Sequence, residues 1–224
     1  MEDYSKFKCH YMEKGEIWQI AENFRAEFWP EGTLPVDIER IVEKRLKLNI
    51  EPEHGLLSDS DIDAFLRTDF TGIVVDYRCL MEERFINRLR FSYAHELGHL
   101  FLHKEIYKNF TIRTSKEWEE FMLNMPEREY KFFEYQANEF AGRVLVPRDR
   151  LFSELEICLN KIQRIGMLDY IASDPGIVLS SISPTLCKPF GVSDQVIERR
   201  VEREELWPPK IEYINGEGVK LQKL

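Results

Sequence analysis

The segment His95-Glu96-Leu97-Gly98-His99 most constrains what this chain can fold into. It lies inside a longer apolar run, which predicts a helix packed against a core. Two histidines four residues apart lie on one side of a helix, about 40° apart around its axis and about 6 Å apart along it. Their imidazoles can therefore bind one metal ion, as in the H-E-x-x-H pattern of zinc hydrolases. Glu96 lies about 100° away around the axis, beside the metal, where its carboxylate can take a proton from water.

Length, charge and cysteine content limit the classes of protein that remain. The chain has 224 residues, of which 43% are hydrophobic and 32% are charged, as in a globular protein. A net charge of −9 disfavours nucleic acid and anionic membranes as default partners. No run approaches the ~18 apolar residues of a membrane span, and the acidic N-terminus predicts no signal peptide. The four cysteines form no C-x-x-C, so we expect a reduced, cytoplasmic protein.

Apolar spacing predicts a mostly helical α+β fold with one short β region. β-Branched residues bounded by turn residues predict strands at 48–51 and 70–77. Leu97 and Phe101 are expected to bury into the core beside the metal-facing side of their helix. Helices are predicted over 16–28, 35–46, 82–104, 126–145, 151–166, 183–190 and 193–206, with a turn at 174–176.

A catalytic zinc normally has three protein ligands and one open position, so the two histidines need a third partner. The metzincin extension requires a glycine at Leu102 and a histidine at Glu105, and it is therefore absent. His103 continues the row of His95 and His99, but it lies about 12 Å along the axis from His95. It is a candidate for a supporting role or an ordinary helix-end histidine, and the third ligand has to come from another helix.

Two glutamates in the predicted helix 126–145 compete for that role. Glu134 shares its face with Ala137, Asn138 and other small or apolar residues, within about 60°. A lone glutamate on such a face needs a partner, and a metal would be one. Glu139 lies about 140° away, where we expect it in solvent. The pair Asn138-Glu139 nevertheless resembles the Asn-Glu pair that carries the third ligand in thermolysin-like enzymes. Helical geometry favours Glu134 as the third ligand, and Glu139 stays open as the alternative.

Two further features have a functional and an ordinary interpretation. Gly98 costs its helix about 1 kcal/mol relative to alanine, which suggests that a second backbone or a substrate comes close to it. Asp59, Asp61 and Asp63 begin a calcium-loop pattern, but the glycine and glutamate that this loop requires are absent. We therefore expect a solvated acidic loop there.

Three segments together resemble a known family: Arg90 to His103, Glu134-x-x-Ala137-Asn138, and Leu145-Val146-Pro147. They are similar to the ImmA/IrrE family of zinc metallo-endopeptidases. The resemblance implies zinc ligands at His95, His99 and Glu134, with Glu96 as the general base. Mn2+ would also suit a His-His-Glu site.

The resemblance also implies a substrate. Members of that family often cut a repressor or antitoxin-like DNA-binding regulator that is encoded nearby in phage-like or mobile elements. It therefore implies an endopeptidase acting on a protein partner, here a helix-turn-helix regulator. The alternative is a zinc-binding sensor or interaction protein with weak or no peptidase activity, although a purely structural site would not require Glu96.

Stabilising the oxyanion of peptide hydrolysis requires a second electrophile beside the metal. Tyr93, Tyr135, His103 and Arg143 lie near the motif in sequence, and spacing alone does not choose among them. Asn138, on the same helix face as Glu134, is a further candidate for a supporting contact.

The domain organisation follows from these assignments. We expect a loose N-terminal segment (1–15), a zincin-like metallopeptidase domain with a small sheet beside the H-E-x-x-H helix (16–150), a C-terminal helical extension packed on that core (151–206), and a tail that forms a hairpin or stays mobile (207–224).

The C-terminal helices suggest a second type of partner. Residues 183–206, with a break at Gly191, resemble a helix-turn-helix. The second of these helices carries more acidic than basic residues, which suits phosphates poorly, so direct DNA binding is not expected.

Overall fold

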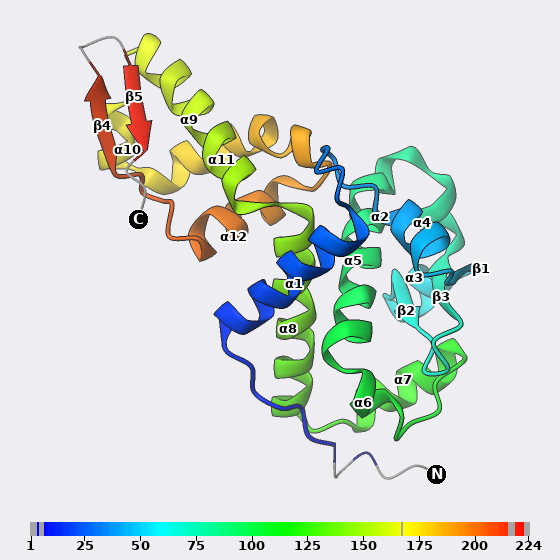
Figure 1. The fold of residues 1–224 in the computed structure, drawn as a ribbon. Helices are drawn as coiled ribbons and strands as arrows, with labels where there is room; N and C mark the ends of the chain where they lie inside the picture. The colour runs from blue at the N-terminus through cyan, green and yellow to red at the C-terminus, as the bar shows by residue number, and fades with distance from the viewer. Residues whose placement is uncertain (1–3, 5–6, 167, 215–217, 222–224) are drawn as a thin grey trace. The chain divides into compact units, whose positions relative to one another are not determined.

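Two compact units make up the chain in the computed structural model, residues 1–145 and residues 146–224 (Figure 1). The structure describes residues 4, 7–166, 168–214 and 218–221. The α+β, mostly helical fold class is confirmed, with a small three-stranded sheet in the first unit. No helix among the described residues combines the length and the hydropathy that crossing a bilayer requires.

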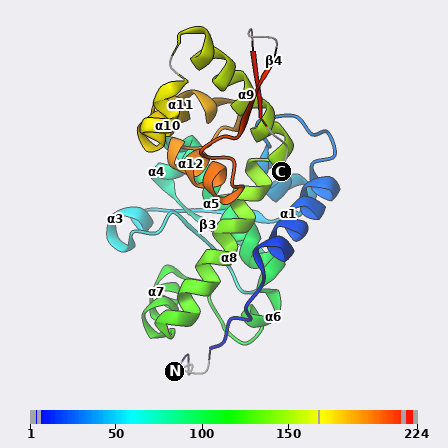
Figure 2. The same cartoon turned by 90° about the vertical axis from the view of Figure 1, so that its left-hand side faces the viewer.

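Three helices form the framework of the first unit. α5 (Ile86–Leu102) and α8 (Glu127–Leu145) lie side by side, and α1 (Lys14–Phe28) packs against α8 (Figures 1 and 2). The predicted helix over 82–104 is shorter at both ends: α4 (Tyr77–Met81) and a 3-10 turn (Glu83–Phe85) precede α5. Leu97 is buried as expected, but Phe101 remains 36% exposed, although its ring contacts Phe24 and Phe28 of α1.

The sheet of the first unit has the order β1-β3-β2. β1 (Asn49–Glu53) pairs in parallel with β3 (Gly72–Asp76), which confirms the two predicted strands with shifted ends. β2 (Ala64–Leu66) pairs antiparallel to β3 and packs beside α5. The sequence did not reveal β2, because three residues after an acidic segment are too short for a period-2 pattern. Part of that acidic segment is a short helix, α3 (Leu56–Ser60).

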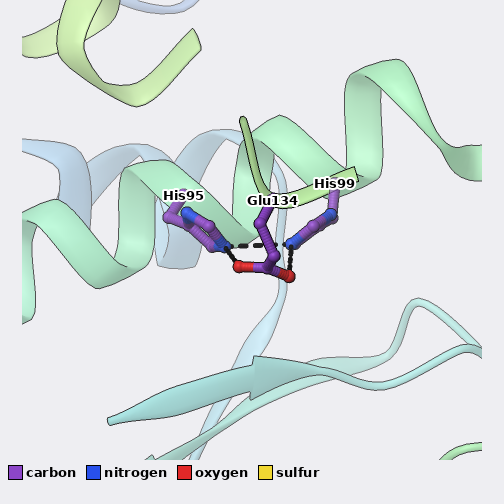
Figure 3. Close-up of side chains that lie close together, drawn as sticks. All are labelled: His95, His99 and Glu134. Atoms are coloured by element: carbon purple, nitrogen blue, oxygen red, sulfur yellow. Dashed lines mark hydrogen bonds and ion pairs between the residues drawn. The ribbon is translucent and has the colours of Figure 1, made fainter. Parts of the chain in front are cut away.

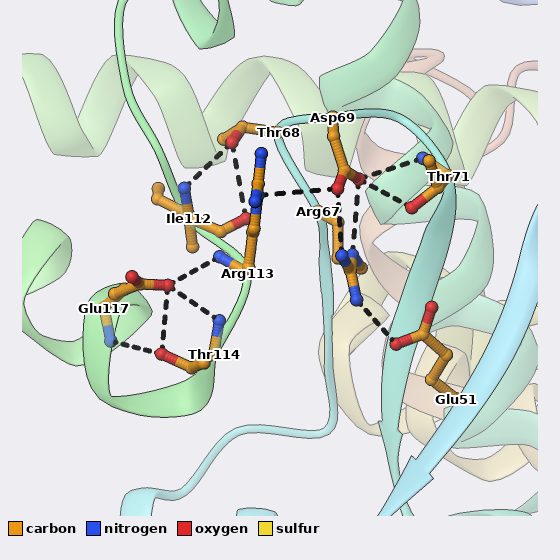
Figure 4. A network of polar contacts seen from close by, with 9 residues as sticks. All are labelled: Glu51, Arg67, Thr68, Asp69, Thr71, Ile112, Arg113, Thr114 and Glu117. Carbon is orange, nitrogen blue, oxygen red and sulfur yellow. Dashed lines mark hydrogen bonds and ion pairs between the residues drawn. The ribbon is translucent and has the colours of Figure 1, made fainter.

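A polar network fixes the turn between β2 and β3 (Figure 4). Arg67 forms ion pairs with Glu51 of β1, at 3.0 Å, and with Asp69 of the turn, at 2.9 Å. Thr68 and Ile112 exchange hydrogen bonds, in which Thr68 N donates to Ile112 O at 3.0 Å and Ile112 N donates to Thr68 Oγ1 at 2.8 Å. The turn is therefore tied both to the sheet and to the segment that leads into the next helix.

Residues 104–124 contain two short helices, α6 (Lys104–Tyr107) and α7 (Ser115–Asn124). Thr114 and Glu117 form a capping box that starts α7. The side chains of Trp118 and Phe121 on the inner face of α7 are buried in the aromatic core. Between α1 and β1, the predicted helix over 35–46 becomes α2 (Ile38–Arg40) and a π-helix (Ile41–Arg45).

The N-terminal segment is not loose where the structure describes it, so that prediction is wrong for Phe7 and Cys9. Both side chains are buried, and the Phe7 ring packs edge-on against Phe133 of α8 at 5.5 Å between centroids. The backbone N–H of Cys9 donates to Glu129 of α8 at 2.8 Å. The apolar residues of this segment are too few to show a period, but they complete an aromatic cluster made by later parts of the chain.

The second unit contains helices and a hairpin, β4 (Ile211–Ile214) paired with β5 (Gly218–Leu221). The segment 215–217 of the tail, which was expected to form a hairpin or stay mobile, lies outside the described residues. The predicted turn at 174–176 is wrong, because Asp174 caps a helix and Pro175 occupies its first turn. Arg200 and Glu204 form a buried ion pair. The helices of the second unit are α9 (Arg148–Arg164), α10 (Asp169–Ser173), α11 (Pro175–Leu186) and α12 (Asp194–Arg203), with a 3-10 turn at Lys188–Phe190.

Candidate metal centre and cleft

The helices α5 and α8 approach each other closely at Gly98. A Cβ added to Gly98 would lie 3.0 Å from Cα and 3.1 Å from the carbonyl oxygen of Ala137. The prediction that a second backbone approaches Gly98 is confirmed, and that backbone belongs to α8. Gly98 lies between His95 and His99 in α5, and Ala137 follows Glu134 by about one turn in α8, so this contact brings the two helices together near these side chains.

Replacing Gly98 by alanine should destabilise the first unit and weaken metal binding. Overpacking typically costs about 1–3 kcal/mol, offset in part by the gain of about 1 kcal/mol from replacing a helical glycine. Gly15 in α1 is the matched control, because a Cβ there would meet nothing within 4 Å. Urea unfolding gives the free energy of unfolding of both variants. A Gly98→Ala protein as stable as the Gly15→Ala protein would contradict the role of Gly98 in close helix packing.

His95, His99 and Glu134 meet where α5 faces α8 (Figure 3). The Nε2 atoms of the two histidines are 3.0 Å apart. The carboxylate of Glu134 lies 3.2 Å from His95 Nε2 through one oxygen and 3.5 Å from His99 Nε2 through the other. Among the described residues this is the one group of three or more His, Cys, Asp or Glu whose ligand atoms all lie within 4.8 Å of one another.

The spacing of these atoms fits a tetrahedral metal ion. Zinc bonds of about 2.0–2.1 Å at tetrahedral angles place neighbouring ligand atoms about 3.3 Å apart. The three contacts, at 3.0, 3.2 and 3.5 Å, lie around that value. Two neutral imidazoles and one carboxylate are also ligands that a borderline-soft dication accepts.

The expectation that Glu139 lies in solvent is wrong. Its side chain is 5% exposed, and its Oε2 accepts a hydrogen bond from Trp18 Nε1 of α1 at 3.0 Å. α8 has two buried faces, one toward α5 with Glu134 and one toward α1 with Glu139. The structure thus turns Glu134 toward the histidines and Glu139 away from them.

The three grouped side chains have strongly shifted pKa values. Burial alone would lower the pKa of His95, but the carboxylate of Glu134 outweighs it and raises the pKa to about 9. Burial lowers the pKa of His99 to about 4. Burial alone would raise the pKa of Glu134, but the charge of His95, whose Nε2 lies 3.2 Å away, holds it well below its usual range. At neutral pH the group is therefore a charged His95, a neutral His99 and an ionised Glu134.

Metal affinity should consequently rise with pH up to about 9. His95 has to lose its proton to bind a metal, and this proton competes with the metal below the His95 pKa of about 9. The apparent association constant should increase about tenfold per pH unit over the neutral range. Competition with a chromophoric chelator, corrected for the chelator's own protonation, measures this slope. A constant affinity between about pH 6 and pH 8 would contradict a raised pKa at His95.

Glu96 lies beside this group but is held by the sheet. Its Oε2 accepts a hydrogen bond from the backbone N–H of Leu66 in β2 at 2.7 Å, and its side chain is 3% exposed. Burial raises the pKa of Glu96 to about 8, reinforced by Glu134 and opposed by His95 and the Leu66 N–H. A carboxylate in this setting can both take up and release a proton near neutral pH.

The supporting residues proposed from the sequence fall into two sets. Asn138 Oδ1 lies 3.3 Å from His95 Nδ1, and His103 Nδ1 lies 3.0 Å from His99 Nδ1, so both contact the central histidines. Tyr93 is buried on the other side of α5, where burial and the charges of Glu39 and Glu43 raise its pKa.

The other two candidates for a second electrophile also lie away from the group. Arg143 forms an ion pair with Glu22 and lies over the ring of Trp18. Tyr135 is not among the residues that line the cleft described next. Neither side chain is therefore placed to contact a substrate in that cleft.

A cleft of about 240 Å³ opens beside the grouped side chains. Its wall includes Tyr130, which the sequence analysis missed, although its position one turn before Glu134 places the two on one face of α8. Its lining combines apolar and acidic side chains. The lining residues are Asp61, Ile62, Asp63, Ala64, Phe91, Ser92, His95, Glu96, Trp118, Met122, Tyr130, Glu134 and Asn138.

Comparison with known proteins identifies the class to which this fold and site belong. The chain matches the IrrE N-terminal-like domain, a peptidase family designated M78, over residues 80–202, which include α5 and α8. This match spans just over half of the 224 residues, and the chain belongs to the ImmA/IrrE family.

Other comparisons are more distant. A Mycobacterium tuberculosis transcriptional regulator of known structure aligns with 83% of this chain at 16% sequence identity and a TM-score of 0.48. The alignment covers 46% of the regulator, so this chain spans less than half of the regulator's length. No curated protein matches the chain.

Proposed function

We propose that this protein is a zinc-dependent endopeptidase that hydrolyses a peptide bond in a protein substrate. The observation that carries the proposal is that His95, His99 and Glu134 meet at ligand spacing beside a cleft lined by His95, Glu96 and Glu134. Family membership supports the same activity, since the family is a peptidase family.

The residues divide the chemistry between them. His95, His99 and Glu134 would hold the dication, with Mn2+ as an alternative to Zn2+. When bound, the ion supplies a Lewis acid that acidifies water and polarises the scissile carbonyl. Glu96 accepts the proton of the attacking water and transfers it to the leaving amine. The Leu66 N–H keeps the Glu96 carboxylate oriented through this transfer, since it holds one oxygen at 2.7 Å.

Tyr130 is the cleft residue best placed to assist. It lines the cleft together with Glu96 and Glu134, and burial, reinforced by the charges of Glu134 and Glu96, raises the pKa of its hydroxyl to about 12. The phenol therefore remains protonated at neutral pH and can donate a hydrogen bond to the developing oxyanion.

The substrate we propose is a helix-turn-helix transcriptional regulator encoded near this gene, in a phage-like or mobile element. The proposal is supported by membership of the ImmA/IrrE family, because the resemblance of this chain to that family implies such a substrate. The four cysteines are free thiols, which favours a cytoplasmic setting for this activity.

Cleavage of the neighbouring regulator tests the proposal. Zinc-loaded protein is incubated with that regulator and, in parallel, with a library of unbiased peptides, and the products are identified by mass spectrometry. We expect two fragments whose masses sum to the substrate plus one water, and no fragments after removal of the metal with a chelator. Equal cleavage with and without metal would contradict the proposal. Tight zinc binding without cleavage in either assay would favour a sensor.

A further inference from the structure

A chain of buried polar contacts leads away from His99, on the side opposite to the grouped Nε2 atoms. His99 Nδ1 lies 3.0 Å from His103 Nδ1, and His103 Nε2 lies 2.9 Å from Gln136 Oε1. Gln136 Nε2 donates to the backbone carbonyl of His10 at 2.7 Å. The side chains of His99, His103 and Gln136 are 0%, 2% and 1% exposed, so this series is shielded from water. We refer to these three side chains and the His10 carbonyl as the His99 relay.

The His10 carbonyl fixes the direction of every hydrogen bond in the His99 relay. A carbonyl can only accept, so the Gln136 amide must present its NH2 group to His10 and its oxygen to His103. That oxygen lies 2.9 Å from His103 Nε2, where two facing lone pairs would repel, so His103 must carry its proton on Nε2 and donate it. His103 Nδ1 is then an acceptor, and His99 must donate to it from a protonated Nδ1. A neutral His99 with its proton on Nδ1 carries its lone pair on Nε2.

The opposite end of the relay requires the same direction. His99 Nε2 is the atom that faces His95 and Glu134, at 3.0 and 3.5 Å, and a metal can bind it only through a lone pair. Both ends thus demand one arrangement, although they lie on different elements and are separated by the full length of the relay. We propose that the backbone carbonyl of His10, acting through Gln136 and His103, sets His99 in its metal-binding tautomer. This inference rests on the proposed metal site and not on peptidase activity.

Contacts with α8 anchor the N-terminal segment, and this anchoring holds the His10 carbonyl at the end of the His99 relay. It runs beside α8 before α1 begins (Figures 1 and 2). Cys9 N donates to Glu129, and the Cys9 thiol lies 3.9 Å from His103 Nε2 and 3.7 Å from Gln136 Oε1, where it covers the middle of the relay. Phe133 stacks on the rings of His99 and His103, at 4.1 and 4.3 Å between centroids. His103 is therefore a positioning residue, since it acts on the metal through His99.

Imidazole tautomers can be observed directly. Long-range 1H–15N correlation spectra of the full-length protein, with and without Zn2+, distinguish Nδ1–H from Nε2–H imidazoles. We expect His99 protonated on Nδ1 and His103 protonated on Nε2 in both states, because the relay sets the tautomers before metal binds. A metal-free His99 protonated on Nε2, or a His103 protonated on Nδ1, would overturn the proposal.

Metal affinity measures the consequence for the site. His103→Leu, which cannot accept a hydrogen bond, should weaken Zn2+ or Co2+ binding by about 10- to 100-fold. His103→Gln can accept from His99 and donate to Gln136, so it should recover most of that affinity and the tetrahedral Co2+ absorption spectrum. Tyr93→Phe is the matched control, because Tyr93 is a buried aromatic residue of the same helix outside the relay. It should bind metal like the unchanged protein.

Two outcomes separate this inference from the proposed metal site. If His99→Ala loses metal while His103→Leu and His103→Gln both bind it normally, the metal site stands and the relay is wrong. If His99→Ala retains full affinity, the metal site itself is wrong. Thermal unfolding of the metal-free variants is recorded in parallel, and equal affinity loss in the Leu and Gln variants would also overturn the relay, because it would indicate a packing effect.

Discussion

Replacing Glu96 by glutamine should reduce peptide-bond hydrolysis by about 10²- to 10⁴-fold while metal stays bound. An amide cannot take up the proton of the attacking water, so proton transfer is lost. Its oxygen can still accept the Leu66 N–H that holds the carboxylate at 2.7 Å, so the local structure should persist. The ratio kcat/KM for a cleaved substrate measures the first effect, and metal content measured by elemental analysis measures the second.

Glu105→Gln is the control for the loss of one carboxylate. Glu105 lies on the exposed surface of α6, where it pairs with Lys108, and it does not line the cleft. Its replacement should leave turnover unchanged. A Glu96→Gln protein that cleaves its substrate within about tenfold of the normal rate would contradict the general-base assignment, since the expected loss is larger.

Replacing Glu134 by alanine should abolish tight metal binding, whereas Glu139→Gln should preserve it. Removal of a direct ligand should exceed the roughly 10- to 100-fold loss that is typical of an outer contact. The Glu139 side chain faces Trp18, and a glutamine there can still accept the Trp18 hydrogen bond. Chelator competition with Zn2+ measures both affinities.

The comparison is informative because the two glutamates lie on the same helix and are both largely buried. A Glu134→Ala protein with normal affinity, paired with a Glu139→Gln protein that loses metal, would reverse the ligand assignment. Equal losses in both would indicate that packing of α8, and not a particular carboxylate, controls metal binding. In that case Gly98→Ala should produce a similar loss, since it disturbs the same helix pair.

Local periodicity explains what the sequence could predict about this site. Helical geometry relates His95, Glu96 and His99 within one helix, and it placed Glu134 on a face suited to close packing. The glycine between the histidines also indicated a close approach, which Ala137 makes. The fold class and the family followed from these same segments.

The features that the sequence did not reveal all depend on contacts between distant elements. Glu139 was expected in solvent because it lies far around the helix axis from Glu134. The sequence did not reveal that α1 packs against that other face of α8. The hydrogen bond from Leu66 to Glu96 requires β2, a strand too short to give a pattern. The N-terminal segment reaches Gln136 through a backbone carbonyl, which no side-chain pattern encodes.

Residues of the second unit illustrate a different limit. Asp174-Pro175-Gly176 fits a turn, but the same residues fit the start of a helix, with Asp174 as the cap and Pro175 in the first turn. Local chemistry satisfies both structures, and the residues that follow decide between them.

The most direct test is to locate the metal. A crystal of the zinc-loaded protein, measured on both sides of the zinc absorption edge, should give one strong anomalous peak between α5 and α8. We expect this peak at about 2.0–2.1 Å from His95 Nε2, His99 Nε2 and a carboxylate oxygen of Glu134. A peak bound by Glu139, or a zinc ion held elsewhere with these three side chains unbound, would contradict it.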